Sequence, residues 1–432
     1  MNSGITYDDN RDRHKVRLPL VIFLGFVIFG SICAGLYLIS DSDAISSIPS
    51  EFAESASVAT ITESTSSNPF SLLSTLVTKT ITNVSHSISP TLNPNLNYNY
   101  GVAMGDLLPG LSATDLNTTL NDLASLHVGW IRLDMAWNDI QPVNSTTYNW
   151  TNMDRVVAAA NAHQIQLLPI LDYTPKWARS SACAGTPKCQ PADPTAFATF
   201  AKVAATRYAP QGIVAWEIWN EPNSNGFWKP SPDPAAYTTL LKYTYTAIKS
   251  VEPSSIIISG GLSPAITKGG RISPMDFLKG MYANGAKGYF DAFGFHPYTY
   301  PVLPTYYQSW NAWSQMSQTN PSLQSIMVTN GDSDKKIWFT EFGSPTGGPG
   351  KVATSATNPE SGADHVTESV QAQILQSAIQ QHKTYTWAGP FFLYSYKDQG
   401  TSSDTVENFF GLLRFDGTPK PSYSLFSQLI AP

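Results

Sequence analysis

The sequence predicts a (β/α)8 barrel, an α/β fold, preceded by an N-terminal transmembrane helix and a disordered Ser/Thr-rich stalk. Three observations support this prediction. Short apolar runs alternate with helical segments eight times from Tyr98 onward, residues 18–39 contain no charged residue, and Ser and Thr dominate residues 40–97. Alternating strands and helices build parallel sheets, and eight such units close into a barrel. A chain of 432 residues is long enough for one large domain with extensions.

The first segment is predicted to cross a membrane. As a helix rising about 1.5 Å per residue, residues 18–39 would reach roughly 33 Å, which spans a bilayer. Four basic residues lie between positions 11 and 17, and the next one is Lys79. The positive-inside rule therefore places residues 1–17 in the cytoplasm and the C-terminal bulk outside. A cleaved signal peptide is the alternative, but its apolar region usually has about 7–15 residues, so we expect an uncleaved anchor.

Residues 40–97 are predicted to form a flexible linker. Their apolar residues are scattered and sustain no helical or strand period. Such a segment cannot bury enough apolar surface to offset the entropy lost on ordering. We therefore expect a stalk that holds the domain at residues 98–432 away from the membrane.

Within the barrel, each predicted strand is a short apolar run and each predicted helix follows it in the chain. The predicted strands are 100–105, 129–134, 165–172, 213–220, 255–260, 290–296, 336–341 and 390–396. The predicted helices are 114–126, 151–163, 195–207, 234–250, 274–284, 305–318, 365–382 and 422–430. In this fold the catalytic groups lie at the C-terminal ends of the strands, so polar residues at the strand ends are the candidate site residues.

Composition excludes several classes of function. The net charge is −6, which argues against a nucleic-acid partner. The seven histidines show no metal-ligand spacing, and there is no Gly-rich phosphate loop, so no cofactor or metal is expected. Cys183 and Cys189 lie close together in a loop, where they either form a local disulfide or remain two free thiols.

Two predicted strands end in a glutamate. The stretch WEIWNEPN ends the fourth strand with Glu221, and IWFTEFG ends the seventh with Glu341. Alternation puts Asn220 and Glu221 on opposite faces, so the chain must kink if both are to reach one cavity. Glu217 lies deeper and is expected to form a structural ion pair. Two glutamates at the mouth of a barrel are the parts that a retaining glycosidase needs.

Other strand ends supply further candidates. Arg132 and Asp134 alternate inward on the second strand, where Arg132 either keeps Glu341 ionised or pairs with Asp134 or Glu217. Trp137 follows in the loop as a candidate for stacking against a sugar. Further candidates end the third, sixth and eighth strands: Asp172 and Tyr173, His296 and Tyr298, and Tyr394 or Tyr396.

The motifs WNEPN and FTEFG resemble the acid/base and nucleophile strands of clan A retaining glycoside hydrolases. The stretch from Val128 to Ala178 and the closing run from Asn408 to Pro421 are similar to family 39 and related bacterial polysaccharide-cleaving barrels more than to classical cellulases. The resemblance covers roughly residues 98–432.

The resemblance implies a division of roles. Glu341 would be the nucleophile, Glu221 the acid/base, and Asn220 the group that binds the sugar 2-hydroxyl. Tyr298 would orient the nucleophile beside His296. Many clan A barrels carry a tryptophan under the sugar on the eighth strand, whereas this chain has FFLYSY there, so Tyr394 or Tyr396 would replace it unless Trp387 is displaced.

The resemblance thus implies hydrolysis of an extracellular poly- or oligosaccharide with retained configuration and no cofactor. Three alternatives remain: transglycosylation by the same glutamates, a non-catalytic carbohydrate-binding barrel, and a membrane-tethered adhesion or spacer protein. Oligomeric state, sugar and linkage are not predicted.

Overall fold

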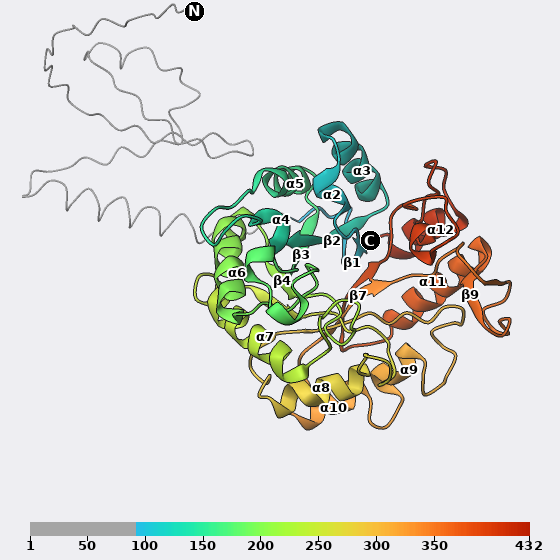
Figure 1. The fold of residues 1–432 in the computed structure, drawn as a ribbon. Coiled ribbons are helices and arrows are strands. Elements are labelled where there is room, and N and C mark those ends of the chain that lie inside the picture. Colours follow the sequence, from blue (N-terminus) through green and yellow to red (C-terminus); the bar gives the residue numbers. More distant parts are fainter. Residues whose placement is uncertain (1–91) are drawn as a thin grey trace, which may run out of the picture. The chain divides into compact units, whose positions relative to one another are not determined.

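The computed structural model describes residues 92–432, in which eight parallel strands form a closed barrel (Figure 1). The sheet order is β5-β4-β3-β2-β1-β10-β7-β6, and all neighbouring strands run parallel. Bridges between Ile258 and Ala292 and between Leu262 and Phe295 join the two end strands. The strands are β1 Asn97–Ala103, β2 Val128–Ala136, β3 Gln166–Asp172, β4 Ala215–Ile218, β5 Ile256–Ser259, β6 Phe293–Phe295, β7 Ile337–Phe342 and β10 Ala388–Leu393. The predicted barrel is confirmed.

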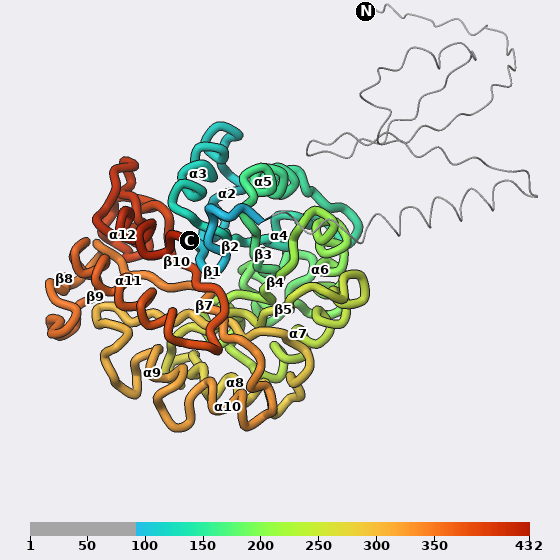
Figure 2. Tube along the Cα trace, turned by 180° about the vertical axis from the view of Figure 1, so that it is seen from behind, coloured from blue at the N-terminus to red at the C-terminus, as the bar shows by residue number. Residues whose placement is uncertain are grey.

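Helices follow one another around the barrel in chain order (Figures 1 and 2). They are α2 Leu107–Gly110, α3 Ala113–Ser125, α4 Trp137–Ile140, α5 Thr151–Ala162, α6 Pro194–Tyr208, α7 Pro234–Lys249, α8 Pro274–Ala283, α9 Ala312–Ser317, α10 Leu323–Thr329, α11 Glu368–His382 and α12 Pro421–Ile430. A small parallel pair, β8 Lys351–Ala353 and β9 Ala363–Val366, lies in the loop between β7 and α11.

Three barrel helices begin with the same local chemistry. Asp193, Asp233 and Ser273 each accept a hydrogen bond from a backbone N–H of the first turn, and each is followed by proline. The side-chain oxygen satisfies an otherwise unpaired N–H, while proline at the first position has none to satisfy and is already fixed at a helical φ. These starts agree with the sequence prediction to within one residue.

The barrel interior is filled, not open. Each strand, or the residue directly before it for β6, contributes one side chain to a single buried cluster. Trp130 and Trp338 meet edge to face at 5.8 Å between ring centroids, and Phe392 stacks on Trp338. Alanines from neighbouring strands leave room for these large rings. The cluster comprises Ala103, Trp130, Leu168, Ala215, Ile258, Ala292, Trp338 and Phe392. This buried cluster lies beneath the polar groups at the C-terminal strand ends.

The helix predicted at 305–318 is wrong in its first half. Residues 305–310 form an exposed loop, and α9 begins only after Asn311, whose side chain accepts a hydrogen bond from Trp313 N. The segment then forms a second helix, α10, that was not predicted. Similarly, residues 363–366 are strand β9, and α11 starts after Thr367 caps it.

The predicted cytoplasmic tail, transmembrane helix and nearly all of the predicted stalk lie outside the described residues. Within residues 92–432, no helix combines the length and the apolar character that a membrane crossing requires.

Candidate active site

Arg132 lies at the centre of a polar network at the barrel mouth. Its Nε and Nη2 donate to the two carboxylate oxygens of Glu217 at 2.6 and 3.0 Å, and its Nη1 donates to Glu341 Oε1 at 2.5 Å. Nη2 also donates to Asn220 Oδ1 at 2.9 Å. Arg132 and Glu217 are almost fully buried. Both interpretations of Arg132 therefore hold, because it forms a structural pair with Glu217 and also contacts Glu341.

The end of β4 is kinked, as its sequence predicted. Trp219 and Glu221 have φ angles of 71° and 43°, in the left-handed region that residues with side chains seldom adopt. The backbone N–H of Glu221 donates to Gly261 O at 3.0 Å, which fixes the turn. Consequently Asn220 and Glu221 both reach the mouth, although strict alternation would separate them.

His296 bridges the two candidate catalytic carboxylates. Its Nδ1 lies 3.1 Å from Glu221 Oε1 and 3.5 Å from Glu341 Oε2. The two oxygens are therefore no further apart than these distances combined, which is compatible with the separation of about 5–5.5 Å in retaining glycosidases. Each glutamate side chain is 15% exposed, so both remain accessible while most of their water is excluded.

Glu341 is held ionised by its neighbours. Burial acts to raise its pKa, but His296 and Arg132, together with the hydrogen bond from Tyr298, outweigh that effect and lower the pKa. Tyr298 OH donates to Glu341 Oε2 at 2.7 Å. Burial and the adjacent Glu341 raise the pKa of Tyr298 well above its ordinary value, so the phenol keeps its proton. Glu341 thus receives donors on both oxygens.

Asp134 and Asp172 form a second acidic pair beside this network. Asp172 is completely buried, and neither of its oxygens has a hydrogen-bond partner. Burial, and then Asp134, raise the pKa of Asp172 well above its ordinary value. Burial raises the pKa of the partly exposed Asp134 to about 7, although Arg132 opposes the rise. Asp172, a candidate for the rim, therefore lies beneath it.

Tyr394 directly follows the eighth barrel strand, β10, and reaches the site. Its hydroxyl donates to Glu407 at 3.3 Å, and its ring packs against Phe410 at 5.1 Å. The peptide bond between Tyr394 and Ser395 is cis. Trp387 precedes β10 and therefore lies at the opposite end of the barrel, stacked on Tyr385.

The predictions for Trp137 and Tyr396 are wrong. Trp137 starts helix α4 and is fully buried, with its N–H bonded to Gln141 and its ring stacked on Phe200, so no sugar can reach it. Tyr396 points outward, and its hydroxyl donates to Asp122 on α3 at 2.8 Å. Both side chains fasten helices to the barrel.

Sequence reasoning missed two charged residues at the mouth. Glu407 follows β10 in a short 3-10 helix, Val406–Phe409, and its charge adds to burial in raising the pKa of Tyr394 and of Tyr300. Lys188 lies 3.8 Å above the Phe227 ring, next to the Cys183–Cys189 disulfide that the structure forms. Neither lies on a strand, so the alternation that found the other candidates gave no signal for them.

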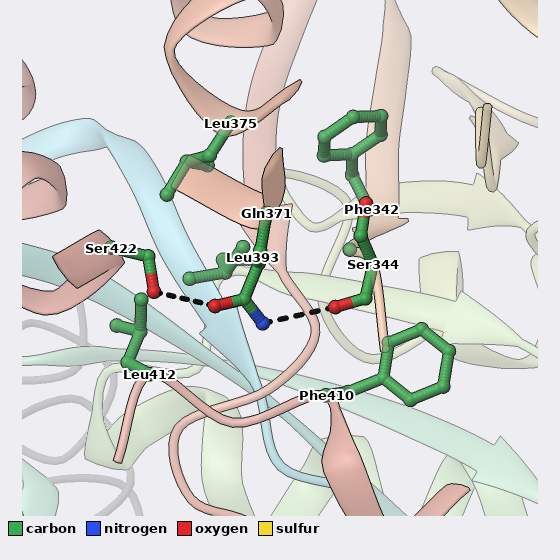
Figure 3. Close-up of a pocket in the computed structure, with 9 residues that line it drawn as sticks. Phe342, Ser344, Gln371, Leu375, Leu393, Phe410, Leu412 and Ser422 are labelled. Carbon is green, nitrogen blue, oxygen red and sulfur yellow. Dashed lines mark hydrogen bonds between the residues drawn. The ribbon is translucent and has the colours of Figure 1, made fainter. Parts of the chain in front are cut away.

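A pocket lies where the end of β7 and the helices α11 and α12 meet (Figure 3). Gln371 crosses it, donating to Ser344 O at 2.9 Å and accepting from Ser422 Oγ at 2.7 Å. Phe410 lines both the pocket and the site, since it also contacts Tyr298. No charged side chain lines this pocket. The two hydrogen bonds of Gln371 join α11 to α12 and to the residues after β7. Its lining is Phe342, Gly343, Ser344, Gln371, Leu375, Leu393, Phe410, Leu412 and Ser422.

An eight-stranded parallel barrel with two neighbouring glutamates at its mouth is the arrangement that a retaining glycoside hydrolase requires. The chain matches the model of the cellulase family, glycosyl hydrolase family 5, over residues 107–387. It belongs to this family and is a retaining glycosyl hydrolase of clan A. The resemblance implied this clan and mechanism, but it favoured family 39 over the cellulases, whereas the matching family is that of the cellulases.

Solved structures of other glycoside hydrolases share the fold. A family 39 enzyme from Bacteroides cellulosilyticus WH2 is 23% identical with a TM-score of 0.59, covering 80% of this chain and 66% of its own. A family 39 β-xylosidase from Caulobacter crescentus is 18% identical with a TM-score of 0.55, and the match covers 78% of this chain and 72% of that protein. Xylanase 10B from Thermotoga petrophila RKU-1 is 15% identical with a TM-score of 0.53, and the match covers 78% of this chain and 94% of that protein. The chain thus spans just under two thirds of the first of these proteins.

Proposed function

We propose that the protein hydrolyses a polysaccharide by double displacement, with Glu341 as nucleophile and Glu221 as acid/base. The observation that carries this assignment is the contrast between the two glutamates. Arg132 and Tyr298 donate to Glu341, which favours its ionised form, whereas among residues 92–432 the side chain that contacts the Glu221 carboxylate is that of His296 alone. An ionised carboxylate attacks carbon, while a less tightly held carboxyl is free to exchange a proton.

In the first step, a Glu341 oxygen bonds to the anomeric carbon as the glycosidic C–O bond breaks. Glu221 gives its proton to the leaving oxygen. In the second step, Glu221 takes a proton from water while the water oxygen displaces Glu341 from the sugar. Arg132 and Tyr298 stabilise the charge that returns to Glu341 when it leaves.

Asn220 is placed to bind the sugar beside the reacting carbon. Arg132 donates to its Oδ1, which orients the amide, and the Asn220 side chain also hydrogen-bonds Tyr173. One N–H of the amide is left for a substrate hydroxyl. A hydrogen bond to the 2-hydroxyl strengthens as positive charge develops on the ring. Asp134 and Tyr394, both partly exposed, complete the polar walls of the sugar site.

We further propose that the barrel works outside the cytoplasm, held by the N-terminal span. The uncharged segment 18–39 and the basic residues before it support this topology. The Cys183–Cys189 disulfide supports it independently, because such bonds persist in oxidising compartments.

The division of roles is tested with alanine variants on two kinds of substrate. Glu341→Ala should abolish turnover on polysaccharides and on aryl glycosides alike, and added azide should restore activity with an inverted product. Glu221→Ala should barely act on polysaccharide, whose leaving group needs a proton, but should still form covalent glycosyl-enzyme from an activated aryl glycoside. Equal losses on both substrates for Glu221→Ala would contradict the assignment.

A further inference from the structure

Six consecutive residues after β6, from Thr305 to Trp310, are exposed, and three of them are aromatic. Tyr306, Tyr307 and Trp310 are 40%, 60% and 51% exposed. The rings of Tyr306 and Trp310 lie 6.3 Å apart. Exposed aromatic rings are scarce elsewhere in residues 92–432, where Tyr243 and Phe415 stand singly. We call Tyr306, Tyr307 and Trp310 the aromatic loop cluster.

The cluster lies on the catalytic side of the barrel. Its loop leaves the C-terminal end of β6, the same strand end that carries His296 and Tyr298. Aromatic contacts continue along this loop from the site, because the Tyr298 and Tyr300 rings are 6.2 Å apart and both pack on Phe410. A sugar chain bound at Glu341 therefore meets the Tyr298 and Tyr300 rings at the start of the loop that carries the cluster.

Hydrogen bonds hold the loop in place although its side chains are exposed. Tyr306 N donates to Leu303 O at 3.0 Å, and Asn311 N donates to Gln308 O at 2.9 Å. Gln315 on α9 donates to Ser309 O at 3.0 Å. The opposite loop also contributes, since Leu303 N donates to Ala356 O. A surface held in its binding shape loses less entropy when a ligand arrives.

The chemistry of the cluster selects an uncharged ligand. No acidic or basic residue occurs between His296 and Asp332. No lysine or arginine lies over these three rings among the contacts of the described residues, whereas Lys188 covers Phe227 on the other side of the mouth. Open Tyr and Trp faces with nearby amide and hydroxyl groups suit the apolar faces and hydroxyl edges of neutral sugars.

We propose that the aromatic loop cluster is a second carbohydrate-binding site, which holds a neutral stretch of the polysaccharide beyond the catalytic centre. The proposal rests on the proposed function for the identity of the ligand class. It assigns the cluster to binding of the polymer and gives it no part in bond cleavage.

Affinity electrophoresis of the full-length chain tests the proposal, with hydroxyethylcellulose, xylan and mixed-linkage β-glucan cast separately into native gels. The double variant Tyr307→Ala/Trp310→Ala should bind the retarding polysaccharide at least fivefold more weakly. Its rate on that polymer at low concentration should fall by a similar factor, while its rate on a short aryl glycoside stays within twofold. The matched control Tyr243→Ala, an exposed tyrosine on α7, should behave as wild type.

The outcomes separate this proposal from the proposed function. The wild type could bind one of these polymers without cleaving it, and the double variant could lose that retardation. This outcome would support the cluster as a sugar site and contradict the proposal that this polymer is the substrate. Unchanged retardation in the double variant, an equal loss in Tyr243→Ala, or no retardation of wild type by any of the three polymers would overturn the cluster as a sugar site.

Discussion

Arg132 is the residue on which the site most depends, since it neutralises two glutamates at once. Breaking a buried ion pair from one side leaves the other charge without compensation and costs about 3–5 kcal/mol. Arg132→Met should lower the free energy of unfolding by about that amount, because Glu217 would remain buried with only Gly261 N donating to it. Urea denaturation at pH 7 measures the loss.

An exposed ion pair provides the control for Arg132. Arg207 contacts Asp154 at 2.5 Å, but both side chains are 39% exposed. Solvent screens such pairs, so Arg207→Met should cost less than about 1 kcal/mol. Similar losses in the two variants would show that burial of the Arg132–Glu217 pair does not set its contribution.

Asp172 should make the fold less stable as the pH rises. Because burial raises its pKa in the folded protein, the folded state binds the proton more tightly than the unfolded state. Stability is therefore full below the ordinary carboxyl pKa and falls as the pH rises through the folded value. Asp172→Asn removes the ionisation and should therefore stabilise the protein more at pH 8 than at pH 4.

Urea denaturation of wild type and Asp172→Asn from pH 4 to pH 8 measures this difference. Asp134, with its pKa raised to about 7, is the neighbouring group that titrates in the same range. A stability difference that does not change with pH would rule out Asp172 as the titrating group.

At the scale of elements, strand ends were predicted well and loops poorly. Alternation along a strand fixes which side chains point inward, so Arg132, His296 and Tyr298 could be assigned from the sequence. Trp137 could not, because the chain turns into helix α4 directly after β2 and the ring packs against α6. Tyr396 failed for a similar reason, since β10 ends at Leu393 and alternation no longer holds beyond it.

Gly261, just after β5, links two of these strand ends. Its N–H donates to Glu217 and its carbonyl accepts from Glu221 N, and a Cβ at this position would overlap His296 and Thr340. Overpacking of this kind costs about 1–3 kcal/mol. Gly261→Ala should therefore displace His296 and reduce kcat at least tenfold, with a smaller loss of stability.

Gly110 provides the matched control, because a Cβ there would have no neighbour within 4 Å. Gly110→Ala should leave kcat unchanged and leave thermal stability equal or slightly higher. If Gly261→Ala kept full activity, the close approach between Gly261 and His296 would not be needed to position His296.

At the scale of the whole molecule, the barrel was predictable because its signal repeats. Eight apolar runs that alternate with helices commonly form one closed structure, the (β/α)8 barrel. The family match agrees with this fold. Glu407 and Lys188 reach the mouth on segments outside the barrel strands, whose paths depend on contacts far away in sequence. The buried Lys420–Asp398 pair is such a contact, since Lys420 also donates to Thr346 and so joins the closing run to the loop after β7.

The last prediction concerns the side of the membrane on which the barrel lies. The charge-free segment 18–39 with basic residues before it should leave residues 1–17 in the cytoplasm and the barrel outside. Protease added to intact cells should therefore remove the barrel and spare an epitope tag placed before residue 18, whereas lysed cells should lose both. Non-reducing peptide mapping of the same preparation should recover Cys183 linked to Cys189, because the barrel then folds where disulfides persist. A barrel that survives protease in intact cells, with both cysteines as free thiols, would place it in the cytoplasm and contradict the proposed topology.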